Sequence, residues 1–305
     1  MPVPVRAVHR PDGHFWWFQQ VQTGIHDMKS VLLSSVVALG LSAALVSPVM
    51  AYETVSTVAP GGKGFVGLGV LSKPDYEGSD DNEITLAPFG QYFWASGRYA
   101  KLGGTGGSEN AGRLSLNLIT RDSSENWTFG PLLQYRLKRD DDVDNQQVKR
   151  MKEVDAATEL GVFVGYDTGP WSAEVSFAGD VSDEHDGYLV YLKGGYDLMQ
   201  TEKVLVTLGV DTTWADSSYM ETYFGVDNKN VGSSGLPFYK PDSGFKDVTL
   251  SLTGVYHFNK TWGAAANASY TRMLNDAEDS PLVEGNQGVG DKNQLTGIFA
   301  VLYSF

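Results

Sequence analysis

The final stretch of the chain, residues 293–305 (NQLTGIFAVLYSF), constrains the fold more than any other. Every second residue from 295 is apolar or aromatic, apart from Gly297: Leu295, Phe299, Val301, Tyr303 and Phe305. Successive side chains of a strand point to opposite faces, so this row would cover one side of an extended segment. A soluble sheet seldom leaves such an edge open, because an open edge recruits other chains. Barrel closure removes the edge and a bilayer covers the apolar row, so we predict the closing strand of an outer-membrane barrel.

Composition excludes several other classes of protein. No run of about 18 or more apolar residues follows residue 51, which argues against a helical membrane protein. The 23 basic and 37 acidic residues give a formal charge of −14, which argues against a nucleic-acid partner. A solvated surface is sufficient to explain this acidity. Cysteine is absent, so the sequence has no disulfides and no thiolate metal site.

The N-terminal region has the features of a secretory signal sequence. Lys29 precedes an apolar run, 31–46 (VLLSSVVALGLSAALV), and small residues follow up to Ala51. This pattern predicts a signal peptide at 28–51, with a lone membrane anchor as the alternative. Met28 is the more natural start, so residues 1–27 are expected to be an upstream extension outside the fold. The barrel is then expected to comprise residues 52–305.

The rest of the chain divides into strand-like segments joined by alternately short and long connections. Twelve segments are predicted: 64–71, 84–94, 98–104, 112–120, 126–138, 155–167, 171–182, 187–198, 203–214, 245–258, 261–273 and 293–305. Short turns on the periplasmic side and longer loops outside are typical of bacterial barrels, and an even strand number returns both ends to one side. We therefore predict an all-β fold, a closed antiparallel transmembrane barrel of about twelve strands.

Alternation within the segments predicts which side chains face the lumen. In 171–182, for example, Trp171, Val175 and Phe177 alternate with polar residues. The predicted lumen-lining set carries both signs of charge: Arg113, Arg136, Lys138, Glu159, Glu174, Asp180, Lys193, Asp197, Asp211, Asp247 and His257. Mixed charges either line a small aqueous passage or pair and close it. The length of 215–244, sufficient to fold inward, favours a restricted lumen.

Aromatic residues cluster beside the short turns. The predicted membrane-interface girdle comprises Trp94, Trp127, Trp171, Trp262, Tyr303 and Phe305. Amphipathic rings settle at the headgroup level of a bilayer, which explains a belt at one end of a barrel. Chance placement of core aromatics is the alternative.

The sequence offers little catalytic chemistry. After processing only His185 and His257 remain as imidazole bases, and neither G-x-S-x-G nor H-E-x-x-H occurs. His185 lies in an acidic loop, where it is either a solvated residue or the base of a surface hydrolase. The run 140–144 (DDDVD) lacks the glycine of an EF-hand loop, although it has the composition to gather divalent cations among lipopolysaccharide phosphates. We expect no enzymatic activity, no cofactor and no dedicated metal site.

Four motifs make the chain similar to a known family. They are 74–81 (PDYEGSDD), 214–226 (WADSSYMETYFGV), 234–237 (SGLP) leading into 244–248 (GFKDV), and 279–283 (DSPLV). Together they resemble the MipA/OmpV outer-membrane proteins over nearly all of 64–305. The aromatic residues Tyr219, Tyr223 and Phe224 of the second motif are expected to pack into the barrel mouth or to form a partner surface.

The resemblance implies a barrel in the outer membrane of a Gram-negative envelope. The family name refers to a membrane-bound lytic transglycosylase, which implies a scaffold or anchor that brings murein hydrolase and murein synthase together in the periplasm. Other members look like permeability or adhesion proteins, so a narrow channel for small solutes is the alternative. The expected partners also include the lipid bilayer, lipopolysaccharide and, through the C-terminal strand, the barrel-assembly machinery. No family catalytic residues are carried over to this chain.

Overall fold

The computed structural model describes residues 63–104, 109, 111–284 and 288–305. The predicted extension at 1–27, the predicted signal peptide at 28–51 and the first residues of the predicted barrel, 52–62, lie outside the described residues.

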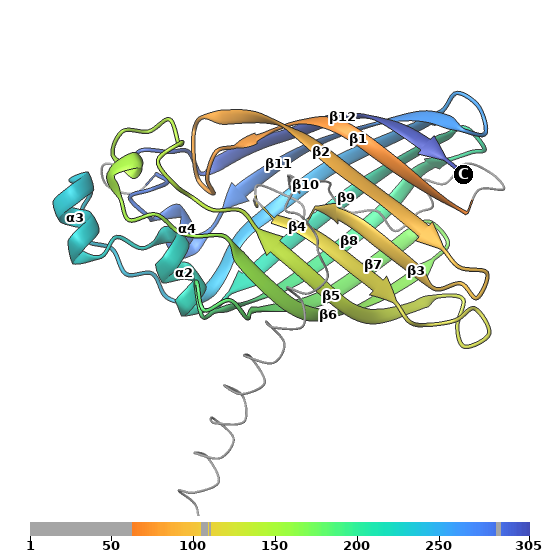
Figure 1. Ribbon diagram of the computed structural model, residues 1–305, viewed down its shortest axis with the longest axis horizontal. Helices are drawn as coiled ribbons and strands as arrows, with labels where there is room; N and C mark the ends of the chain where they lie inside the picture. Colours follow the sequence, from red (N-terminus) through yellow and green to blue (C-terminus); the bar gives the residue numbers. More distant parts are fainter. Residues whose placement is uncertain (1–62, 105–108, 110, 285–287) are drawn as a thin grey trace, which may run out of the picture. The chain divides into compact units, whose positions relative to one another are not determined.

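Twelve antiparallel strands form one closed barrel, as predicted (Figure 1). The strands are β1 (Gly64–Pro74), β2 (Asn82–Phe93), β3 (Tyr99–Gly104), β4 (Ala111–Asn117), β5 (Trp127–Arg136), β6 (Ala157–Thr168), β7 (Trp171–Asp180), β8 (Tyr188–Gln200), β9 (Val204–Ala215), β10 (Gly244–His257), β11 (Trp262–Met273) and β12 (Asn293–Ser304). Each strand pairs with its neighbour in sequence, and β12 pairs with β1 from Ser304↔Phe65 to Gly297↔Ser72. The backbone carbonyl of Phe305 also accepts hydrogen bonds from the N–H groups of Lys63 and Gly64. The predicted closing strand is therefore confirmed.

Short helical segments occupy the connections at the long-loop end. They are the 3₁₀ helix η1 (Val148–Arg150) and the α-helices α2 (Ser217–Phe224), α3 (Asn228–Ser234) and α4 (Asn275–Glu278). Figure 1 shows α2, α3 and α4 gathered at the end of the barrel opposite the C-terminus. None of the helices among the described residues is long and apolar enough to cross a bilayer.

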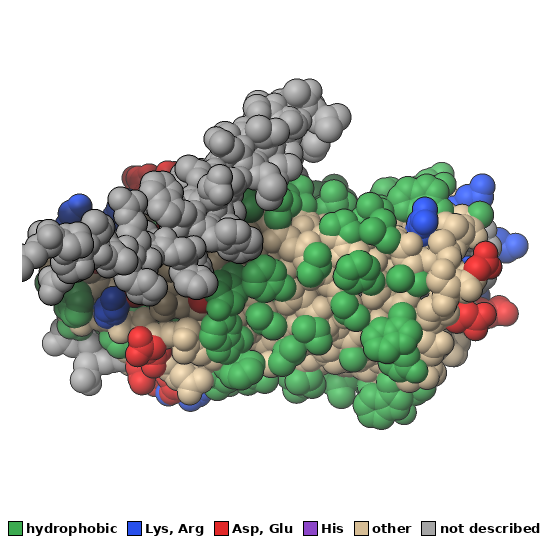
Figure 2. All heavy atoms as spheres, turned by 90° about the horizontal axis from the view of Figure 1, so that it is seen from below, with side chains coloured by type: hydrophobic (Ala, Val, Ile, Leu, Met, Phe, Trp, Pro, Cys, Tyr) green, Lys and Arg blue, Asp and Glu red, His purple; other side chains and the backbone are tan. Residues whose placement is uncertain are grey.

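The outer wall of the barrel is apolar. In β7, Trp171, Val175 and Phe177 are exposed, whereas Ser172 and Ser176 are buried. Figure 2 shows apolar side chains spread over the wall, with charged side chains towards its two ends. In water each Leu- or Phe-sized side chain left exposed forfeits roughly 1.5–3 kcal/mol, so a wall of this kind needs lipid as its solvent.

Aromatic side chains surround the short-turn end of the wall. The six residues of the predicted girdle, Trp94, Trp127, Trp171, Trp262, Tyr303 and Phe305, are all on the outside, with exposed fractions of 41–61%. Several contact a second ring on the neighbouring strand: Trp171 with Tyr196 at 4.5 Å between ring centroids, and Trp262 with Tyr303 at 5.1 Å. Their place beside the turns fits the predicted membrane interface.

Side chains fill much of the barrel interior. An apolar cluster lies on the inner face of β1, β2 and β9–β12, and it includes Phe65, Phe89, Leu205, Ile298 and Leu302. A second cluster combines inward residues of β5–β9 with the loop residues that cover the mouth. The described part of the lumen is consequently in large part a packed core.

Candidate functional site

Helix α2 occupies the long-loop end of the lumen. Its N-cap is Asp216, whose carboxylate accepts hydrogen bonds from the N–H of Tyr219 (3.1 Å) and from the N–H of Tyr188 on β8 (3.0 Å). These bonds satisfy a free donor of the first turn and tie the helix to the barrel wall. The helix buries Tyr219, Met220, Tyr223 and Phe224, so the predicted packing of its aromatic residues into the mouth is confirmed.

The first long loop, 75–81, packs into the same end. The Tyr76 hydroxyl donates to the carbonyl of Leu282 (3.1 Å), and the next residue, Glu77, is buried. Gly78 has φ +100°, and a Cβ there would lie 2.4 Å from Cγ2 of Val283. The loop turn therefore depends on glycine for its backbone conformation and for space. The contact joins the first and last of the sequence motifs.

A charged cluster lies beneath these two loops. We call it the mouth network, and it consists of Glu77, Glu109, Arg136, Glu159, His185, Tyr191, Tyr219, Lys246 and Asp247. The Arg136 guanidinium donates to Glu159 (Nε–Oε1, 2.7 Å) and to Glu77 (Nη1–Oε1, 3.0 Å). The same guanidinium lies over the Tyr219 ring, with 4.9 Å between its central carbon and the ring centroid.

Lys246 is the second cation of the mouth network. Its ammonium lies 2.7 Å from Asp247, 3.0 Å from Glu109 and 3.3 Å from Glu77. Glu77 therefore contacts both cations, and it also accepts a hydrogen bond from the Tyr219 hydroxyl (2.8 Å). Removal from water raises the pKa of Glu77, an effect opposed by the nearby Lys246 and Arg136 charges.

The His185 side chain is buried in the mouth network and is not exposed to solvent. It is 3% exposed, its Nδ1 accepts from the Gly187 N–H (3.1 Å), and its Nε2 lies 3.2 Å from Glu159 Oε1. Because Nδ1 accepts, Nε2 carries the proton and donates to the carboxylate. The rings of Tyr219 and Tyr223 lie against it. The prediction of a loop histidine accessible at the surface, whether solvated or the base of a hydrolase, is wrong.

One cavity of about 220 Å³ lies in the lumen on the side of the short turns. It is bounded by residues of β2–β7, the turns 95–98 and 118–126, and Lys193 of β8. Its charged lining residues are Lys101, Arg113, Arg121, Glu125, Asp167, Glu174 and Lys193, and its aromatic lining includes Phe93, Tyr99 and Phe163. We call it the turn-side cavity.

Arg113 connects the turn-side cavity with the mouth network. Its Nη1 donates to Glu174 (3.3 Å) and Ser176 (3.0 Å), and its Nε donates to Gln134 (3.1 Å). The Gln134 amide in turn donates to Glu159 (2.5 Å) and Tyr191 (2.7 Å). One chain of hydrogen bonds thus runs from the cavity to the packed mouth.

Most of the predicted lumen-lining residues are enclosed by the barrel. The buried members are Arg113, Arg136, Glu159, Lys193, Asp197, Asp211, Asp247 and His257, and Glu174 is partly buried. Arg136, Glu159 and Asp247 meet in the mouth network, whereas Arg113, Glu174 and Lys193 line the cavity. Asp197 accepts from the Thr207 hydroxyl (2.8 Å), and His257 lies near the short turns.

Two predicted lumen residues have other positions. Strand β5 ends at Arg136, so Lys138 lies in the following loop, where its side chain is 61% exposed and paired with Asp140. Its predicted place in the lumen is wrong, because β5 and its alternation of side chains end at Arg136. Asp180 lies at the end of β7 and accepts hydrogen bonds from the backbone N–H groups of Ser182, Glu184, His185 and Asp186. Its carboxylate therefore organises the 181–187 loop.

The predicted lumen-lining set does not include five buried residues that the structure adds: Glu77, Glu109, Gln134, Tyr191 and Lys246. Gln134 and Tyr191 lie on the inward face of their strands, and this alternation is the signal that points to them. Lys246 is buried beside Asp247 because the pairing of β9 with β10 shifts register between Phe245 and Asp247. Such a bulge turns two successive side chains to one face, which strict alternation cannot predict.

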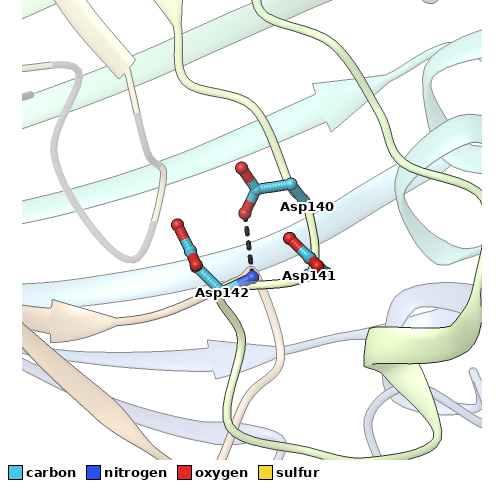
Figure 3. A group of neighbouring side chains, drawn as sticks. All are labelled: Asp140, Asp141 and Asp142. Atoms are coloured by element: carbon cyan, nitrogen blue, oxygen red, sulfur yellow. Dashed lines mark hydrogen bonds between the residues drawn. The ribbon is translucent and has the colours of Figure 1, made fainter.

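The acidic run after β5 brings three carboxylates together. One oxygen from each of Asp140, Asp141 and Asp142 lies within 4.8 Å of the others (Figure 3). Two of the three side chains are exposed, and the Asp140 carboxylate accepts from the Asp142 N–H (3.1 Å). The Lys138 ammonium hydrogen-bonded to Asp140 lowers the pKa of that carboxyl. Solvated acidic turns commonly have this arrangement, and it is insufficient to define a metal centre.

Comparison with known proteins gives consistent relatives. The sequence model of the family described as "MltA-interacting protein MipA" matches residues 66–305. The MltA-interacting protein of Escherichia coli (strain K12) is 27% identical over 228 residues, which cover 72% of this chain and 82% of that protein. The outer membrane protein OmpV of Vibrio cholerae is 26% identical over 144 residues, covering 45% of this chain and 52% of that protein.

Among solved structures, the NanC porin aligns with a TM-score of 0.44 and 11% identity, covering 79% of this chain and 100% of that chain. The sequence relatives are named either MltA-interacting protein or outer membrane protein. The family match over residues 66–305 and the names of these sequence relatives identify the protein as an outer-membrane β-barrel, and the chain belongs to the family of MltA-interacting protein MipA.

Proposed function

We propose that this barrel is an outer-membrane anchor that binds a murein-remodelling enzyme of the periplasm through its short-turn face. The observation that carries the proposal is the packing of α2 and the mouth network into the long-loop end, because an occupied lumen is poorly suited to free diffusion. The name of the Escherichia coli relative supports a partner of this kind. The family resemblance implies a lytic transglycosylase and, with it, a murein synthase.

The short-turn face offers one prominent ordered element, the turn 118–126. Its Arg121 N–H donates to the Ser96 carbonyl (2.9 Å), and Asn117 accepts from the Ile119 N–H (3.1 Å). Asp122 and Glu125 remain exposed. A fixed turn with exposed charges can contribute to recognition without the entropic cost of ordering a loop on binding.

The test is direct binding between purified proteins. The barrel in detergent micelles is immobilised, and a purified periplasmic lytic transglycosylase is passed over it. The double variant Asp122→Lys/Glu125→Lys is expected to weaken binding by about tenfold or more, since charge reversal at an interface opposes association. Asp141→Lys/Asp142→Lys, with the same charge change at the opposite end, is the matched control and should bind normally. No binding by the unaltered barrel would refute the anchor.

A narrow channel for small solutes is the second candidate, favoured by the polar turn-side cavity. Reconstitution in planar bilayers separates the two functions. We expect no steady conductance, because α2 fills the mouth; a stable open state would favour the channel. We also propose that the barrel has no enzymatic activity of its own, that its acidic loops face lipopolysaccharide, and that β12 engages the barrel-assembly machinery.

A further inference from the structure

We propose that the outermost part of the long-loop end binds the phosphate groups of a polysaccharide through four exposed basic residues. We call this group the basic tip, and it consists of Lys149, Arg150, Lys152 and Lys229. The first three lie in and just after η1, and the fourth lies in α3. The proposal goes beyond the anchor function, which would use the opposite face of the barrel.

The packing of two apolar residues turns the first three cations to the outside. Val148 and Met151 are buried in an apolar cluster formed by the long loops. The residues next to them, Lys149, Arg150 and Lys152, are exposed. The loop core therefore fixes the backbone under these cations and leaves their charges in water.

Hydrogen bonds hold η1 against α3. The Lys152 N–H donates to Oδ1 of Asn230 (2.8 Å), and the Arg150 guanidinium donates to the Ser234 carbonyl (Nη2–O, 3.5 Å). Lys229 is the neighbour of Asn230 in sequence, so the four cations lie on one surface. Figure 1 shows α3 farther from the strands than α2 and α4, at the end of the barrel opposite the C-terminus.

The basic tip lacks the carboxylate partners that other cations of the long loops have. Lys138, Lys240 and Lys292 each form an ion pair with a carboxylate. No side chain of the basic tip forms an ion pair within the part of the chain that the structure describes. Its charges are therefore available to a ligand.

The local charge is positive although the whole chain is acidic. Residues 145–153 and 227–234 contain two carboxylates, Glu153 and Asp227, against the four cations. Asp227 is also engaged as the N-cap of α3, where it accepts from the Asn230 N–H (2.7 Å). The formal charge of the chain is −14, but charges beyond the Debye length of about 8 Å are largely screened at physiological salt. A polyanion at the tip is consequently attracted.

The exposure of the four cations favours a ligand with several anionic groups. One exposed ion pair changes an affinity by about fivefold at most, so a single anion would be held weakly. A chain that contacts several cations together gains from each contact after the first, because the later contacts are intramolecular. A phosphate monoester carries a charge of about −1.5 to −2 and three acceptor oxygens, more than a carboxylate offers.

The position of the basic tip favours a sugar polymer that arrives from outside. The longer loops of bacterial barrels face the exterior, where phosphorylated sugar chains are common polyanions. The tip is the part of these loops farthest from the strands, so a soluble polysaccharide reaches it more directly than the headgroups of the membrane do.

The test is calorimetric titration of the full-length barrel in detergent micelles with dextran that carries phosphate monoesters. Unmodified dextran of the same length is the neutral probe, and polyglutamate is an acidic polymer without sugar. We expect dextran phosphate to bind, polyglutamate to bind about tenfold more weakly per anionic group, and dextran not to bind. Raising the salt from about 0.1 M to about 1 M shortens the Debye length from about 10 Å to about 3 Å and should remove most of the binding.

A pair of double variants assigns the site. Lys149→Gln/Lys152→Gln should weaken the binding of dextran phosphate by about tenfold or more. Lys138→Gln/Lys240→Gln makes the same change of net charge at exposed lysines of the same two loops, and it should weaken binding by less than about twofold. Circular dichroism establishes that both variants are folded.

Four outcomes would overturn the proposal. The first is the absence of heat from dextran phosphate at millimolar phosphate. The second is equal weakening by the two double variants, which would show an effect of overall charge. The third is binding of polyglutamate as tight as that of dextran phosphate, which would indicate an acidic polypeptide partner. The fourth is loss of binding in liposomes that contain lipopolysaccharide, which would assign the tip to phosphates of the membrane itself.

Discussion

Glu77 of the first long loop and Arg136 of β5, 59 positions apart in sequence, lie 3.0 Å apart (Oε1–Nη1) in the buried mouth of the barrel. The other carboxylate oxygen of Glu77 lies 3.3 Å from the Lys246 ammonium. One loop carboxylate thereby holds cations from two distant strands, β5 and β10. The long-loop end is consequently stabilised by charge pairing as well as by apolar packing.

Glu77→Ala should strongly destabilise the barrel. It leaves Arg136 and Lys246 with one fewer carboxylate and the Tyr219 hydroxyl without its acceptor. Breaking a buried pair from one side typically costs about 3–5 kcal/mol. The free energy of unfolding in micelles, followed by tryptophan fluorescence in urea, measures the loss. Asp81→Ala, an exposed position in the same loop, should change it by less than about 0.5 kcal/mol. Equal effects of the two variants would contradict the network.

Gly78→Ala should also destabilise the mouth, by roughly 1–3 kcal/mol, because its φ of +100° is unfavourable for alanine and its Cβ would meet Val283. The same urea titration applies. Gly232→Ala is the matched control, since Gly232 lies inside α3 and a Cβ there has nothing within 4 Å. That change should be neutral or stabilising by up to about 1 kcal/mol. A harmless Gly78→Ala would show that the 75–81 turn adapts easily.

Alkaline pH should loosen the mouth. Burial raises the pKa of Tyr76, Tyr219 and Tyr223, and it raises the pKa of Tyr239 to about 12. Unfolded tyrosine titrates near about 10, so between about pH 10 and the folded pKa values the unfolded state has lost protons that the folded state keeps. The free energy of unfolding is therefore unaffected by these phenols below about pH 10 and falls as pH rises above it.

Phenolate absorbance followed during a pH titration measures this effect. Tyr219→Phe retains the ring and removes one of the titrating hydroxyls, so it should reduce the alkaline loss of stability. If all tyrosines of the folded protein ionised together at about pH 10, the predicted rise in the pKa of the buried tyrosines would be wrong.

Removal of α2 should open the barrel. Replacement of residues 217–224 by a short Gly/Ser linker takes Tyr219, Met220, Tyr223 and Phe224 out of the mouth, and we expect measurable conductance in planar bilayers. The same replacement of 228–234 is the control, because α3 buries only Ser234 among its residues. Asp211→Asn in the opened barrel should reduce cation preference, since its carboxylate is buried inside the wall. A silent α2 deletion would show that the remaining residues close the lumen.

The strand pattern was predictable because it depends on local chemistry. Alternation in stretches such as Trp171–Asp180, and tryptophans beside short turns, follow from one lipid-facing and one lumen-facing side. These features predicted the twelve strands and the pairing of the last with the first.

The mouth was only partly predictable, because it depends on contacts between distant loops. The aromatic content of 217–224 suggested inward packing. The local sequence does not indicate that Glu77 pairs with Arg136, nor that His185 is buried. Glu77 and His185 each lie in an acidic, turn-rich segment of the kind that is usually solvated. Lys138 illustrates the converse error, a strand extended by two residues beyond its last paired position at Arg136.

The ladder between β1 and β12 has a consequence for biogenesis. These strands are the first and the last in chain order, yet each supplies the other's hydrogen-bonding edge. A fragment that lacks β12 leaves the backbone hydrogen-bonding groups at an edge of its sheet unpaired. The barrel can therefore close only after β12 has been synthesised. Until then the chain carries alternating apolar segments with unpaired strand edges, which are prone to aggregate.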